Sequence, residues 1–163
     1  MSGFHSTLLA DERPVLESCL DANRAAVAAL LEGMSEEEAR RRLVPSLTTL
    51  LGLVKHAAFV ERVWFQAYLL ERPRAEIGLP ETVDESFTLT DADTVATVLA
   101  DHRQACSESR DIAARFPFEH RFGHRRFGTV SLRWLHVHLV QELARHAGHG
   151  DILREQVLAA RDA

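Results

Sequence analysis

Four polar side chains at helical spacing near the carboxyl end of the chain are the best candidates for chemistry. The segment HLVQELARHAGHGD contains His138, Glu142, His146 and His149 at separations of four, four and three residues. Each residue of an α-helix advances by about 100°, so all four fall within roughly a quarter of the circumference. Imidazole and carboxylate groups four residues apart on one face can bind a single divalent cation.

Leucines on the same face determine how this polar cluster is interpreted. With His138 set to zero, Leu135 and Leu153 lie at about 60° and Leu139 at about 100°, among the polar positions. A solvent-exposed polar face would lie away from the apolar stripe, whereas this cluster points inward with it. Burying a carboxylate is costly unless it is paired or binds a cation. A metal site and a buried hydrogen-bond network therefore remain as the two interpretations.

A third ligand is available on an earlier helical segment. In LGLVKHAAFVERVWFQ, His56 shares its face with apolar residues at helical spacing, namely Leu53, Phe59, Val60 and Val63. Facing helices commonly supply the ligands of metal sites in bundle cores. Two imidazoles and one carboxylate leave positions open for water or substrate, as in reactive rather than structural sites.

These observations assign a role to each candidate residue. We predict that the metal ligands are His56, Glu142 and His146. His138 and His149 are predicted to orient the ligands or to move a proton. Arg145 lies at the edge of the same face, and we predict that it contacts a bound cofactor.

The periodicity of apolar residues predicts the elements that position these side chains. Four helices are expected, over about residues 11–32, 48–72, 90–116 and 131–160, with Thr90 or Asp91 as the cap of the third. Ser35 and Glu38 form a capping-box pattern before a short extra turn. Long connections, residues 73–90 and 117–130, separate helices two, three and four, and FGTVSL is a short extended candidate. The sequence predicts an all-α fold, a four-helix bundle in a single domain over residues 1–163.

Composition excludes several classes of partner. A net charge of −5 gives no general reason to expect nucleic acid, although FEHRFGHRRFG mixes basic and aromatic residues. That segment is interpreted as a solvated loop or as a contact for an anionic ligand. No apolar run is long enough to span a membrane. Cys19 and Cys106 stand far apart, which favours reduced thiols and a cytoplasmic location. His102 and His136 are predicted to lie on the surface, and Trp64 and Trp134 in the core or at an interface.

Two segments resemble a known superfamily. RRLVPSLTTLLGLVKHAAFVERVWF and SLRWLHVHLVQELARHAGHGDILREQ are similar to the DinB-like four-helix metalloproteins, in particular the actinobacterial branch with the HAGHxDxLRE ending. The resemblance spans about residues 11–158. It implies a divalent metal, zinc or nickel, held by His56, Glu142 and His146, although the commoner form has histidine in place of Glu142. It further implies a homodimer and a thiol-dependent transferase or isomerase that uses mycothiol, bacillithiol or glutathione.

Three functions follow as hypotheses. The first is a metal-dependent thiol transferase that joins a low-molecular-weight thiol to a small electrophile. Mycothiol is the expected thiol, because the preference for arginine over lysine suggests a GC-rich genome and the resemblance is to an actinobacterial branch. The second is a hydrolase with a metal-activated water. The third is a metal-binding bundle without catalytic activity. Activity that requires thiol separates the first from the other two.

Overall fold

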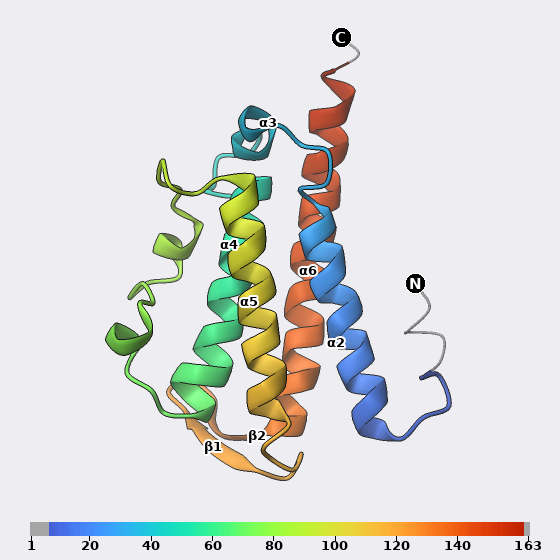
Figure 1. Ribbon diagram of the computed structural model, residues 1–163, viewed down its shortest axis with the longest axis vertical. Helices are drawn as coiled ribbons and strands as arrows, with labels where there is room; N and C mark the ends of the chain where they lie inside the picture. The colour runs from blue at the N-terminus through green and yellow to red at the C-terminus, as the bar shows by residue number, and fades with distance from the viewer. Residues whose placement is uncertain (1–6, 162–163) are drawn as a thin grey trace.

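The computed structural model describes residues 7–161. Its main elements are four long helices that lie side by side (Figure 1): α2 Glu12–Ala29, α4 Leu50–Arg62, α5 Val95–Ala113 and α6 Leu132–Ala159. Helix α4 continues into a π-helical segment, η1 Val63–Leu69. The shorter elements are α3 Glu36–Arg40 and two 3-10 turns, η2 Arg74–Ile77 and η3 Asp84–Phe87. The predicted four-helix bundle is confirmed.

The long helices pack mainly as two pairs. Helix α2 lies against α6, and α4 lies against α5, as Figure 1 shows. Helices α4 and α6 meet across the interior, whereas α2 and α5 contact each other sparsely. Leu135, Leu139 and Leu153 are buried on α6, as their place in the apolar stripe predicts. The α4–α6 contact therefore brings the two predicted ligand-bearing helices together.

Side-chain caps fix where the helices begin. Ser131 accepts a hydrogen bond from the backbone N–H of Trp134 and so starts α6, as predicted. The Ser35 capping box is also present. The predicted cap of the third helix is wrong, because Thr94 caps α5 in place of Thr90 or Asp91. The backbone N–H of Thr90 is bonded instead to the Asp93 carboxylate, which makes a turn of the segment before the helix.

A small hairpin closes one end of the bundle. Strand β1 Arg121–His124 pairs in antiparallel fashion with β2 Gly128–Ser131. The predicted extended piece is β2, and its partner strand was not predicted. Phe118, before the hairpin, and Phe122, in β1, are both buried, so the connection is anchored to the core. The interpretation as a merely solvated loop is wrong for these two residues.

Two histidines predicted on the surface are buried. His102 and His136 are each 2% exposed, which corrects that prediction. They do face away from the predicted cluster, but neighbouring elements cover that side of their helices as well. The His136 ring lies 4.9 Å from Phe118, and its Nδ1 is bonded to the Leu132 carbonyl oxygen. A helical wheel gives direction relative to one face and cannot show how many faces are covered.

The remaining compositional predictions have simple structural counterparts. Cys19 and Cys106 are both free thiols. Burial raises the pKa of Cys106 to about 12, so this thiol stays protonated and unreactive at neutral pH. Trp64 is buried and Trp134 is half-buried. Within residues 7–161, no helix combines the length and the apolar character needed to cross a lipid bilayer.

Candidate metal centre

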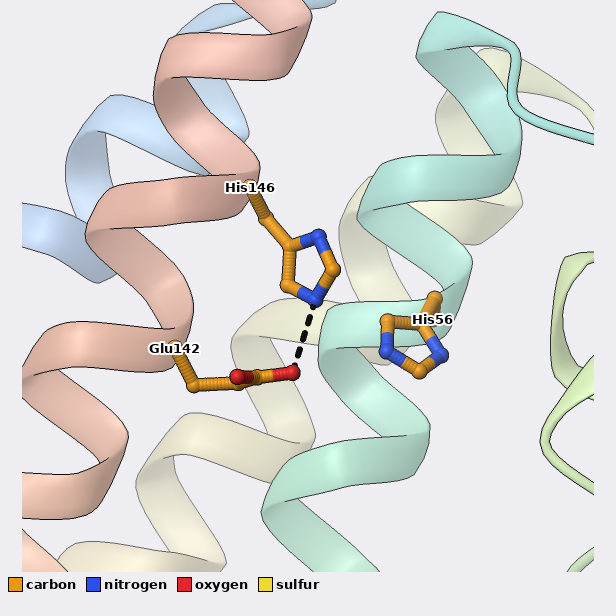
Figure 2. Close-up of side chains that lie close together, drawn as sticks. All are labelled: His56, Glu142 and His146. Carbon is orange, nitrogen blue, oxygen red and sulfur yellow. Dashed lines mark hydrogen bonds and ion pairs between the residues drawn. The ribbon is translucent and has the colours of Figure 1, made fainter.

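The predicted ligands His56, Glu142 and His146 converge between α4 and α6. Figure 2 shows His56 projecting from α4 toward Glu142 and His146, which project from neighbouring turns of α6. One ligand atom from each residue lies within 4.8 Å of the other two. The rings of His56 and His146 are 4.8 Å apart and meet edge to face. Among the described residues, this is the one group of three or more potential ligands that lies close enough to hold an ion.

The three side chains are largely shielded from water. His56 is 4% exposed and His146 is 9% exposed, while the side chain of Glu142 is 24% exposed. Glu142 Oε1 accepts a hydrogen bond from Nε2 of His146 over 3.1 Å. Nδ1 of His146 is buried and has no hydrogen-bond partner in residues 7–161. These polar groups do not fully satisfy one another, which is unusual for a buried network that serves only packing.

A serine outside the predicted cluster fixes the orientation of His56. The hydroxyl of Ser86, in η3, donates its hydrogen to the carbonyl oxygen of Val83. The hydroxyl oxygen of Ser86 must therefore accept a hydrogen bond from Nδ1–H of His56, which lies 2.7 Å away. The consequence is that Nε2 of His56 carries the lone pair. Metal-binding histidines are typically held in this way, with the second ring nitrogen donating to a neighbouring group.

The protonation states also suit metal binding. Burial, followed by the charge of His146, lowers the pKa of His56 to about 4, so its ring is neutral at neutral pH. The hydrogen bond from His146 lowers the pKa of Glu142 to about 2, with further contributions from nearby positive groups, so its carboxylate is ionised. A neutral imidazole and a carboxylate are the forms that coordinate a cation.

The distances can be compared with those around an ion. Bonds of about 2.1 Å in tetrahedral geometry place ligand atoms about 3.4 Å apart. The two ligand atoms that lie farthest apart, within 4.8 Å, would have to approach each other by about 1.4 Å. Rotation of the side chains can produce this approach. The donor set and the free Nε2 of His56 fit a divalent cation, which Nε2 of His146 would bind in place of its hydrogen bond to Glu142.

A cleft of about 590 Å³ opens beside these residues. His56 and Glu142 line it together with the predicted residues His138 and Arg145. The His138 ring stacks on Trp134 at 4.9 Å and is half-buried, and burial lowers its pKa. Arg145 is exposed and lies 3.4 Å from Glu142. His138 and Arg145 are thus placed where a ligand of the cleft would meet them.

His149 occupies a different position. It is exposed, it does not line the cleft, and its ring lies 6.2 Å from that of His146. It shares the face of α6 with the ligands, but it is not part of the group that could hold an ion. Its role in orienting a ligand or moving a proton stays a prediction.

Three residues of the site had no clear signal in the sequence, namely Ser86, Phe87 and Tyr68. Ser86 and Phe87, whose ring stacks on His56 at 4.1 Å, come from the irregular connection between α4 and α5. Tyr68 and the hairpin residues His124 and Phe127 line the cleft as well. Their rings cluster around Trp64, which the π-helical segment presents to the cleft. In the connection between α4 and α5, the apolar Phe87 among acidic neighbours was the one indication that the chain returns to the core.

The sequence of the chain also matches a known protein family. Residues 15–159 match the family described as Mycothiol-S-transferase. The chain belongs to the mycothiol-S-transferase family. A search of curated proteins gave no match. Membership of this family confirms the predicted resemblance to DinB-like proteins. A mycothiol-S-transferase is named for moving a thiol cofactor, and the buried triad of this family member could hold a metal.

Proposed function

We propose that this protein is a metal-dependent mycothiol S-transferase whose cation is held by His56, Glu142 and His146. The family match supports the transfer of mycothiol to an electrophile. The observation that carries the metal assignment is the convergence of two imidazoles and one carboxylate between α4 and α6. A bound divalent cation would lower the pKa of the thiol and favour the reactive thiolate.

The chain's own residues have distinct tasks in this proposal. His56, Glu142 and His146 bind the cation, and Ser86 holds the His56 ring with Nε2 toward it. The ring of Phe87 stacks on the His56 ring and shields it from water. The low number of protein ligands leaves coordination positions open toward the cleft.

His138 is the residue we propose for the proton of the thiol. It lines the cleft, and its lowered pKa keeps the imidazole neutral at neutral pH, so a ring nitrogen can accept a proton. Arg145, at the same rim, is proposed to contact the bound thiol. The expected cytoplasmic location and homodimer are compatible with this function and stay predictions.

The decisive experiment combines metal analysis with a thiol-dependent assay. Purified protein is expected to contain about one divalent metal per chain and to consume an electrophile only when mycothiol is present. His56→Ala and Glu142→Ala should lose both metal and turnover. Glu155→Ala is the control, because this exposed residue of α6 lies outside the site. Turnover without any thiol would indicate a hydrolase, and bound metal without turnover would indicate a non-enzymatic bundle.

A further inference from the structure

The charge of the cleft differs from that of the whole chain. The chain carries a net charge of −5, but the cleft is lined by the cationic side chains of Arg126 and Arg145. Among the described residues that line it, Glu142 is the one carboxylate. If Glu142 binds the cation, no acidic side chain of the lining remains to balance the two guanidinium groups. A cleft of this charge attracts an anionic ligand.

Arg126 lacks the partner that many other arginines of the protein have. Arg62, Arg110 and Arg133 each form ion pairs with carboxylates. Arg126 makes no ion pair with any described residue, and its guanidinium lies 5.4 Å from the centre of the Phe127 ring. Its backbone N–H donates to Nδ1 of His124, which fixes the hairpin turn that carries it. An arginine without a carboxylate, on an ordered turn at a cleft, is available for a ligand.

Three aromatic rings line the cleft beside Arg126, those of Trp64, His124 and Phe127. The ring of Trp64 lies 4.6 Å from that of His124, with 14° between their planes. Phe127 is inclined to Trp64 by 14° as well. These rings cover one another, and Trp64 is buried, but Phe127 is 44% exposed and can contact an aromatic ligand in the cleft.

The thiol cofactor itself does not supply a carboxylate for Arg126. The cysteine carboxyl of mycothiol is bound in an amide to a sugar, so mycothiol has no carboxylate for Arg126. We propose that the second substrate is an aromatic electrophile with a carboxylate, and that Arg126 binds this carboxylate while the ring packs on the exposed Phe127. This inference rests on the proposed function, because it names the substrate class of the same cleft.

The reaction can be tested with matched electrophiles. In chlorodinitrobenzene, the thiol sulfur bonds to the carbon that bears chlorine, and the carbon–chlorine bond breaks. Chloride leaves with the electron pair, and the thiol proton goes to a base or to solvent. Chlorodinitrobenzoate reacts in the same way but carries an added carboxylate. After correction for the uncatalysed rates, the protein with mycothiol should show the higher kcat/KM for the benzoate.

Substitution of Arg126 distinguishes loss of carboxylate recognition from a general loss of activity. Arg126→Gln should lower kcat/KM for the benzoate by about five- to tenfold, because the contact lies in a partly open cleft. The value for the neutral compound should change by less than about twofold, since it has no group for Arg126 to bind. Arg125→Gln is the matched control, because this neighbour does not line the cleft. Equal loss with both electrophiles, or no preference for the benzoate, overturns the proposal.

A binding measurement tests the substrate class without turnover. Both tryptophans, Trp64 and Trp134, belong to the aromatic cluster, so an unreactive dinitrobenzoate that binds there should quench the protein fluorescence. Arg126→Gln should weaken this binding by about five- to tenfold, while dinitrobenzene should bind both proteins alike. If the protein binds dinitrobenzoate but transfers no thiol, the proposed function is contradicted and the role of Arg126 is not. Identical dinitrobenzoate binding by both proteins would contradict the role of Arg126 alone.

Discussion

Two sets of ionisable side chains are buried in this bundle, and they differ in how completely they satisfy one another. Between α2 and α4, Arg24 makes a two-pronged contact with Glu61, at 2.8 and 2.7 Å, and its remaining nitrogen contacts Asp21. Glu61 is fully buried and uses both carboxylate oxygens. Between α4 and α6, Glu142 meets two histidines, and a ring nitrogen of His146 has no partner among the described residues.

This difference separates a structural ion pair from a binding site. Opposite charges that pair in ideal geometry use up their hydrogen-bonding capacity, so no group remains to bind a ligand. A carboxylate that converges with two imidazoles from facing helices instead offers three ligands that an added cation could share. Burial of charge alone therefore does not identify a functional site, and the convergence of several ligands within reach of one ion is the better criterion.

The largest expected effect comes from breaking the Arg24–Glu61 pair. Glu61→Gln leaves a buried arginine without its counter-charge and should lower the free energy of unfolding by about 3–5 kcal/mol. Chemical denaturation measures this loss. Asp21→Asn is the control, because Asp21 also contacts Arg24 but its side chain is 42% exposed, so its loss should cost about 1 kcal/mol or less. Equal costs for the two variants would contradict the comparison.

Metal addition should stabilise only a protein with an intact triad. At a metal concentration about a thousand times the Kd, binding raises the free energy of unfolding by about 4 kcal/mol. Thermal melting of the chelated protein, before and after metal addition, tests this for the wild type and for Glu142→Ala. The Glu61→Gln variant should still gain stability from metal. A similar gain in Glu142→Ala would place the cation elsewhere.

Acidification should destabilise the metal-free protein between about pH 6.5 and pH 4. The pKa of His56 falls from an ordinary 6.5 to about 4 on folding, so in this range the unfolded state binds a proton that the folded state does not. Stability is therefore full above pH 6.5 and decreases as the pH falls, by about 3 kcal/mol for His56. Burial lowers the pKa of His102 and His136 in the same direction.

Denaturation curves at several pH values, with chelator present, measure this dependence. His56→Gln removes one titrating group and should flatten the decrease, while the contributions of His102 and His136 remain. An unchanged slope in His56→Gln would contradict the assigned pKa.

The smallest expected effect is that of Ser86. Ser86→Ala removes the acceptor that holds Nδ1–H of His56 and should weaken metal affinity by about tenfold while leaving the bundle folded. Competition with a chelator of known affinity gives the value. Ser109→Ala is the matched control, since Ser109 is equally buried but lies on α5, outside the triad. An equal change in both variants would show that Ser86 acts only through packing.

The sequence predicted the bundle and the triad for related reasons. Helical periodicity depends on local spacing, so the inward face of α6 and the position of Glu142 and His146 on it follow from the residues alone. His56 could be added because its face is apolar. The same reasoning failed for His102 and His136, since burial depends on which neighbouring elements cover a face, and spacing along one helix carries no such information.

The sequence by itself determined four amphipathic helices and the residue types that could bind a cation. Only the tertiary structure decided that α4 and α6 bring His56 within reach of Glu142 and that Ser86 orients it. It also decided that Arg126 lies at the cleft without an ion pair to any residue from 7 to 161. Ser86 and Arg126 belong to irregular connections, whose conformation depends on long-range contacts with the bundle. Contacts between residues distant in the chain form only when the core packs, so no local pattern records them.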